Sequence, residues 1–215
     1  GDYLKTSRPH VLLGGGGCGM DAEVARKAGY PVVADKEQLQ KFDYAAESRI
    51  CGLFGDGAMG FASQRSASLP GLVDMTSAAV SLLRKNGNGF FLVVNASNIE
   101  RAAARNDINE CIAEIIELDK AVQVAVNMPA EPNDKLILVT GDREMGGLTV
   151  LESNGAGKLP RVAWAGKDVT SRQVCIWSSG LGSASVSSKP DTRYVCRGAV
   201  DEPDVRPARS RWKSM

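Results

Sequence analysis

Short apolar runs in the first quarter of the chain alternate with stretches that have helical spacing. The apolar runs cover residues 9–13, 30–34 and 49–54, and the first and third of them lead directly into glycine-rich segments. Residues 21–28 and 36–42, between these runs, have the length and pattern of short helices. Strands that alternate with helices at this spacing indicate an α/β fold built on a largely parallel sheet.

Longer elements of the same kinds follow in the middle of the chain. Residues 71–85 carry apolar side chains at helical spacing. The uninterrupted apolar runs 90–94 and 135–140 predict buried strands, the first of them in a central position. The longest helix is expected at residues 106–127, with one apolar face turned to the core. That face consists of Ile108, Ile112, Ile115, Ile116, Val122 and Val126.

The last third of the chain has a weaker pattern. Residues 146–159 are typical of a loop or hairpin, and residues 161–165 and 173–177 predict two further strands. No internal repeat and no linker divides the chain before its Pro/Arg-rich end. We therefore expect one domain at residues 1–187 and an extended tail at residues 188–215.

The tail has too little apolar surface to offset the entropy lost when it becomes ordered alone. Trp212 is nevertheless a side chain typical of protein interfaces. We expect the tail to lie on a neighbouring subunit, with Trp212 in an apolar pocket and arginines on an acidic rim. A disordered terminus is the alternative. The partner-binding arginines in this prediction are Arg206, Arg209 and Arg211.

The composition is that of an ordinary globular protein. Hydrophobic residues make up 43% of the chain and the formal net charge is +1, so the chain as a whole is not built to bind nucleic acid. No apolar run reaches the roughly 18 residues that a membrane span needs. Buried or idle thiols are one interpretation of the cysteines, and a Cys175–Cys196 disulfide is another. The sequence begins with Gly1, which favours a processed or trimmed product.

A glycine-rich loop follows the first apolar run. Gly14, Gly16 and Gly19 fit the G-x-G-x-x-G pattern of dinucleotide-binding loops. Asp35 lies at about the distance of 20 residues that this pattern requires. A tight turn between a strand and a helix explains the same glycines, and we favour the turn.

Several short motifs occur in the order found in one known family, the alkaline phosphatases. The resemblance extends over about residues 9–145 and implies a partial alkaline-phosphatase-like three-layer sandwich. It also implies an ancestral chemistry in which two zinc ions, a nearby magnesium ion and a serine nucleophile hydrolyse phosphate monoesters. The motif of that serine would lie upstream of Gly1. The matching segments are PHVLLGGG at 9–16, GLFGDGAM at 52–59, the helix at 69–86, GFFLVV at 89–94, ELDKAV at 117–122 and LVTGD at 138–142.

The family's first group of metal ligands is replaced in this sequence. Residues 94–104 resemble the V-E-G-A-x-I-D-x-x-x-H motif, which supplies one magnesium carboxylate and two zinc ligands. Asn95 stands at the magnesium carboxylate, Glu100 at the zinc aspartate and Ala104 at the zinc histidine. A methyl group cannot bind a metal, so the resemblance implies that this half of the site is dismantled.

The second group of ligands is altered as well. Asp142 keeps a zinc carboxylate, but Arg143 replaces the histidine beside it and brings a fixed positive charge. Val169 aligns with the last zinc histidine. We therefore expect no bound metal and no other cofactor. Asp142 with Glu144 as a residual cation site is an alternative to a surface ion pair.

Two functions are compatible with this pattern. The first is a catalytically inactive, structural or accessory subunit whose partners are other protein subunits of a larger assembly. The second is a fragment of a split or processed zinc-dependent phosphomonoesterase that another chain completes. Three ligand positions lost from this chain count against the second. Because the family is usually extracytoplasmic, the resemblance favours an extracytoplasmic or organellar compartment over the cytosol, although a scaffold need not be retained there.

Overall fold

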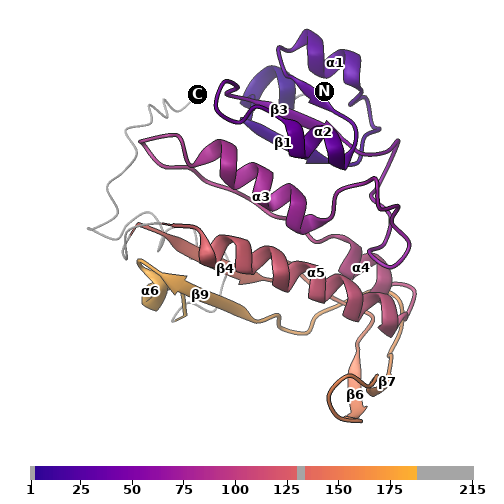
Figure 1. Cartoon of the computed structure of the whole chain (residues 1–215). Helices are drawn as coiled ribbons and strands as arrows, with labels where there is room; N and C mark the ends of the chain where they lie inside the picture. Colours follow the sequence, from indigo (N-terminus) through magenta and orange to yellow (C-terminus); the bar gives the residue numbers. More distant parts are fainter. Residues whose placement is uncertain (1–2, 130–133, 188–215) are drawn as a thin grey trace.

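The computed structural model of the chain describes residues 3–129 and 134–187 (Figure 1). The predicted tail at 188–215 lies outside the described residues, as do its interface residues Arg206, Arg209, Arg211 and Trp212. No helix in the described ranges is both long enough and apolar enough to cross a membrane.

A parallel sheet forms the first part of the domain. β1 (Val11–Gly14), β2 (Val32–Val33) and β3 (Ile50–Leu53) lie in the order β1-β3-β2, with β3 in the middle. A single π-helical turn, η1 (Tyr3–Ser7), precedes β1. This sheet confirms the α/β class and the parallel strands expected from the sequence.

The helices that connect these strands begin at capping aspartates. α1 (Ala22–Lys27) follows Asp21, whose carboxylate accepts a hydrogen bond from the Val24 N–H at 2.8 Å. α2 (Lys36–Lys41) follows Asp35, which accepts from the Gln38 N–H at 2.7 Å. An aspartate at this position accepts a hydrogen bond from an N–H that has no partner within the helix. Asp21 and Asp35 therefore determine where α1 and α2 begin.

The twelve-residue helix α3 (Leu72–Leu83) carries the core of this part of the molecule. Its buried Ala78 and partly buried Met75 pack against a cluster that contains side chains of the parallel sheet and of α2. This confirms the helix expected at residues 71–85. The buried members of the cluster are Val33, Leu39, Ile50, Phe54 and Ala78.

The strand predicted at residues 90–94 is absent from the described structure. The segment is extended, but it belongs to no sheet, and Phe91 and Val93 are 88% and 70% exposed. In Figure 1 it is the thin ribbon that leads from the end of α3 back to α4 (Asn98–Ala103). The prediction failed because an apolar run becomes a buried strand only where neighbouring strands accept and donate its hydrogen bonds.

The longest helix, α5 (Ile108–Asn127), packs against α3 and α4. Its predicted core face is wrong in part, since Ile115, Ile116 and Val126 are each about half exposed. The side chains that α5 buries are instead mainly polar or small. They are Glu110, Cys111, Glu114 and Ala121.

Small antiparallel sheets make up the last part of the domain. β4 (Leu136–Thr140) pairs with β9 (Ile176–Gly180), and the short helix α6 (Ser183–Ser187) packs beside β9. β4 was expected to be a buried strand, but Leu138 is 36% exposed because β9 is the only strand that pairs with it within the described ranges. Two short pairs complete the fold: β5 (Glu144–Met145) with β8 (Val169–Thr170), and β6 (Thr149–Glu152) with β7 (Arg161–Ala163).

Lys135 joins the end of α5 to the start of β4. Its ammonium group donates hydrogen bonds to the carbonyls of Ala125, Val126 and Met128, at 3.3, 2.6 and 3.1 Å. A cation at a helix C-terminus satisfies carbonyls that lack helical partners and interacts favourably with the helix dipole.

Candidate functional site

Packing between α4 and β5 brings three of the predicted metal positions together from distant parts of the sequence: Glu100, Asp142 and Arg143. Ala102 and Ala103 of α4 are buried with Phe61 and Cys111, and Met145 of β5 packs against this cluster. The approach of the two backbones is close, since a Cβ added at Gly146 would lie 3.2 Å from the Ala103 carbonyl oxygen. The turn that follows β4 is therefore held against the side of α4 that carries the buried Ala102 and Ala103.

An ion pair occupies the centre of this site. Arg143 Nη2 donates a hydrogen bond to Glu100 Oε2 at 3.1 Å, and Arg143 Nε lies 3.7 Å from Asp142 Oδ2. The side chains of Arg143 and Glu100 are 48% and 37% exposed, and that of Asp142 is 81% exposed. Glu100 and Arg143, which stand at zinc-ligand positions of the family, thus bind each other. The carboxylate of Asp142 points largely into solvent.

The other three predicted positions contribute no ligand to this pair. Ala104 ends α4, where its N–H donates to the Glu100 carbonyl at 2.9 Å. Val169 lies in β8 opposite Met145 and is half exposed. Asn95 is exposed in the extended segment before α4. The structure therefore gathers Glu100, Asp142 and Arg143 from the predicted set.

The site does not fit the family's metal centre. Within residues 3–129 and 134–187, no three His, Cys, Asp or Glu side chains are placed to hold a metal ion. A divalent cation beside Glu100 would also meet the permanent positive charge of Arg143. The guanidinium group of Arg143 neutralises the charge of the Glu100 carboxylate, as a bound metal ion would in the family.

Glu144 has a structural role that argues against a residual cation site. Its carboxylate accepts hydrogen bonds from the N–H groups of Gly147 and Leu148, at 3.2 Å each, and from the Thr170 hydroxyl. These bonds hold the turn between β5 and β6 and link it to β8. Asp142 has its charged contact with Arg143 instead, which favours the ion-pair interpretation.

The glycine-rich loop after β1 packs against another loop. Gly16 N–H donates to the Gly55 carbonyl at 2.7 Å, and a Cβ at Gly15 would lie 1.7 Å from the Gly57 carbonyl oxygen. These glycines are explained by the close approach of two backbones. The geometry favours a tight structural turn over a dinucleotide-binding loop.

Sequence reasoning missed a row of carboxylates on α5, of which Glu110 and Glu114 are buried and Glu117 is partly buried. Glu117 Oε2 accepts hydrogen bonds from Arg65 Nη2 at 2.6 Å and from the Leu72 N–H at 3.1 Å. The Arg65 side chain is only 9% exposed. This ion pair ties the loop before α3 to the middle of α5.

The two preceding carboxylates bind the same loop. Glu114 Oε1 accepts from the Ala62 N–H at 2.6 Å and from Asn98 Nδ2 at 3.2 Å. Glu110 Oε1 accepts from Ser63 Oγ at 2.5 Å. Glutamates at positions i, i+4 and i+7 share one helix face, and this spacing was the available signal. Their contacts serve the fold and reach no residue of the predicted metal site.

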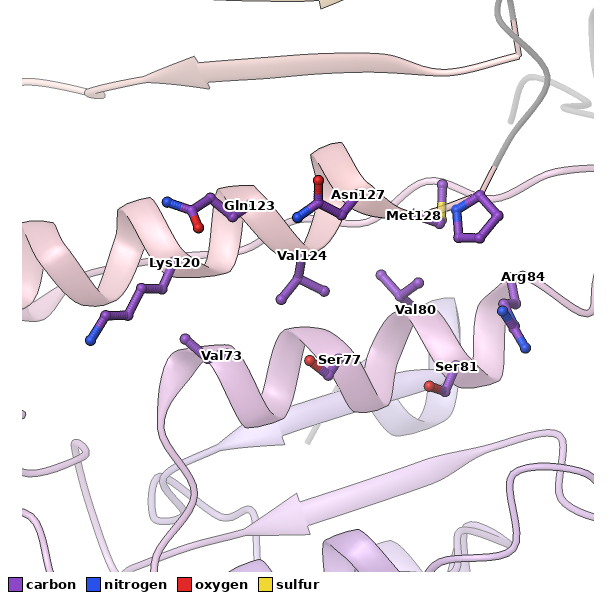
Figure 2. A pocket seen from close by; sticks show the side chains of 11 residues that line it. Val73, Ser77, Val80, Ser81, Arg84, Lys120, Gln123, Val124, Asn127 and Met128 are labelled. Carbon is purple, nitrogen blue, oxygen red and sulfur yellow. The ribbon is translucent and has the colours of Figure 1, made fainter.

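A shallow groove lies between α3 and α5, away from the predicted metal positions (Figure 2). Its volume is about 520 Å³, and Val80 and Val124 point into it. Arg84 and Lys120 lie at its two ends in the close view. None of the predicted site residues lines it.

The described cysteines fall into two groups. Cys51 and Cys111 are buried, and burial raises the pKa of both thiols. Burial and the nearby Asp107 raise the pKa of Cys111 to about 11, so this thiol is neutral at physiological pH. Cys18 and Cys175 are exposed and free. Cys196, the other half of the suggested disulfide, lies outside the described residues.

The parallel sheet and the helices packed on it define a phosphatase-type α/β domain. The sequence matches the family described as alkaline phosphatase over residues 9–192, and the chain belongs to that family. It is 33% identical over 146 residues to alkaline phosphatase 3 of Bacillus subtilis, a match that covers 65% of this chain and 31% of that protein. It is 32% identical over 179 residues to the alkaline phosphatase of Escherichia coli K12, covering 66% and 38%.

Solved structures agree with this assignment. The alkaline phosphatase from the Antarctic bacterium TAB5 superimposes with a TM-score of 0.77 at 18% identity, covering 93% of this chain and 62% of that one, and supports the fold alone. A cold-active alkaline phosphatase from a Shewanella species gives a TM-score of 0.60 at 27% identity, covering 72% and 38%. The chain spans about a third of the length of the curated relatives it matches.

Proposed function

We propose that this alkaline-phosphatase-related chain is catalytically inactive and serves as a structural or accessory subunit of a larger protein assembly. The observation that carries the proposal is the hydrogen bond from Arg143 to Glu100 at 3.1 Å. It places a permanent cation on the carboxylate that stands at a zinc-ligand position of the family. Ala104 and Val169 add two further positions without a metal-binding group.

Exposed apolar side chains support the accessory role. Phe91 is 88% exposed, Trp177 is 62% exposed and Ile115 is 51% exposed. Exposed aromatic side chains such as Phe91 and Trp177 are available as anchors for a contact with another protein. An accessory subunit acts by contacting other proteins and needs no metal ion. This agrees with the loss of metal-binding side chains at Ala104 and Val169.

A fragment of a split phosphomonoesterase is less well supported. A partner chain would have to supply replacements for three ligands whose positions lie on this chain, at Ala104, Arg143 and Val169. It would also have to displace the Arg143 guanidinium group from Glu100.

The test is a zinc measurement on the purified full chain, isolated without chelators and with zinc in the medium, together with an assay on a chromogenic phosphate monoester. We expect far less than one zinc ion per chain and no hydrolysis above the buffer rate. Close to two zinc ions per chain would overturn the proposal. Zinc that appears only after a second protein co-purifies would favour the split enzyme.

A further inference from the structure

The groove between α3 and α5 has an apolar floor and a positive charge at each end (Figure 2). Val80 and Val124 point into it, and the exposed Arg84 and Lys120 lie at its ends. None of the described residues that line it is acidic. Within residues 3–129 and 134–187, neither cationic side chain has a hydrogen-bond or ion-pair partner. The occupant that the groove fits is therefore a segment with both apolar and acidic side chains.

A segment of this composition occurs in the chain itself, at residues 200–205 (VDEPDV). It belongs to the tail, residues 188–215, which lies outside the described residues. Three of the four carboxylates in the tail fall within the segment, and valines stand at its two ends. Pro203 restricts the residue before it to extended backbone conformations, so less entropy is lost when the segment lies along a groove.

The groove and this segment have similar lengths. Along α3 the groove extends from Val73 to Arg84, a helix length of about 16 Å. At about 3.3 Å per residue, an extended stretch from Val200 to Val205 also covers about 16 Å. The ends of the segment therefore match the ends of the groove, where the two cations lie.

The described chain ends close to the groove. Leu181 N–H donates to the Lys135 carbonyl at 3.0 Å, and Lys135 Nζ donates to the Met128 carbonyl at 3.1 Å. Met128 lines the groove at the end that holds Arg84, and α6 starts two residues after Leu181. Residues 188–199, which connect α6 to the acidic segment, reach up to about 40 Å when extended. Such a linker spans the distance and keeps the segment at an effective concentration on the order of millimolar.

We infer that residues 200–205 occupy the groove of their own chain. The segment enters at the end nearest to α6, so Asp201 faces Arg84 and Asp204 faces Lys120. Opposite charges at both ends hold the segment in place, and the apolar floor receives the proline between them. This contact leaves the residues after 205 available for the subunit contact expected from the sequence.

Digestion of the full chain with an endoproteinase that cleaves before aspartate tests this inference. Asp204 and Asp191 both follow a proline, so the two bonds are matched substrates within one tail. We expect cleavage before Asp204 to be at least about ten-fold slower than cleavage before Asp191, because a bound segment is cut only while it is released. Mass spectrometry of the fragments over time measures both rates.

Charge reversal at the ends of the groove should remove this protection. Arg84→Glu with Lys120→Glu repels the acidic segment, so the rate of cleavage before Asp204 should rise at least about ten-fold. The matched control is Lys158→Glu with Lys167→Glu. It makes the same change in net charge at two exposed positions outside the groove, and it keeps the wild-type rate.

Salt provides an arm that needs no variant. Protection of the wild-type chain should fall as the ionic strength rises from about 0.05 to about 1 M, since salt screens exposed ion pairs. Cleavage before Asp191 in the same digest controls for the protease. Protection that does not change with salt would overturn the charge pairing with Arg84 and Lys120.

Two other outcomes would also overturn the inference. Equal rates before Asp204 and Asp191 in the wild-type chain would leave the groove to a segment of another protein. Protection that is lost on dilution would assign the bound segment to a second copy, because binding within one chain does not depend on concentration. The metal positions take no part in this contact, so its failure would leave the zinc result and the proposed function unchanged.

Discussion

Arg143 Nη2 lies 3.1 Å from Glu100 Oε2, although the two residues are 43 positions apart in the sequence. Glu100 lies on α4, and Arg143 follows β4 in the turn that leads to β5. At this site a cationic side chain of the chain itself neutralises a carboxylate that the family resemblance assigns to a metal. Because Arg143 binds Glu100, we expect that metal binding can return only if Arg143 is replaced.

Three substitutions should return a zinc site to this turn. Glu100→Asp, Ala104→His and Arg143→His together would place imidazole and carboxylate groups on α4 and beside Asp142, since residues i and i+4 share a helix face. We expect zinc affinity at least about ten-fold above that of the wild type, measured by calorimetric titration. The control keeps the first two substitutions and uses Arg143→Gln. Equal affinity in the control would contradict a role for position 143.

The ion pair between Glu117 of α5 and the buried Arg65 should contribute much more to stability than a surface ion pair. Glu117→Ala leaves Arg65 without its partner at a site where the arginine is 9% exposed, so we expect a loss of about 3 kcal/mol in the free energy of unfolding. Urea denaturation measures this loss. Glu152→Ala removes an exposed pair with Arg161 and should cost less than about 1 kcal/mol. Similar losses in both variants would refute a special role for α5.

The two loops at the end of the parallel sheet should not tolerate a larger residue at Gly15. A Cβ there would lie 1.7 Å from the Gly57 carbonyl oxygen, so Gly15→Ala must push the loops apart. We expect a loss of about 2 kcal/mol or more in the free energy of unfolding. Gly14→Ala is the matched control, because no atom lies within 4 Å of its added Cβ. A fully stable Gly15→Ala variant would show that the loops are not in contact.

Alkaline pH should destabilise the chain through Cys111. The pKa of this thiol rises from its ordinary value of 9.0 to about 11 in the folded state. Between these values the unfolded chain releases the proton and the folded chain retains it, so the free energy of unfolding falls as the pH increases. The loss attributable to this group approaches about 2 kcal/mol by pH 11. It should vanish in Cys111→Ala and persist in Cys175→Ala, as followed by denaturation at pH 8 to 11 under reducing conditions.

The first part of the fold could be predicted because its signals are local. Asp21 and Asp35 cap α1 and α2 through bonds to N–H groups three residues away, and short apolar runs mark β1 and β3. The same approach failed at Phe90–Val94, where strand formation depends on neighbours that a pattern of side chains does not describe.

The face that α5 buries was harder to predict. Apolar periodicity favoured Ile115 and Ile116, but both are about half exposed, while Glu114 is only 5% exposed. Burial of a carboxylate depends on donors supplied by a distant loop, such as the Ala62 N–H, and those donors are not visible in the helix's own sequence. The predicted metal positions came from the family resemblance, whereas the contact between Glu100 and Arg143 required the structure.

Lys135 gives the connection between α5 and β4 a chemical vulnerability. One ammonium group serves three carbonyls at the end of α5 and stands immediately before the first residue of β4. Acetylation of this lysine would remove the charge and most of its donors at once. The end of a long helix and the entry to a strand would then loosen together, so a single enzymatic modification at this point would act on two elements of the domain.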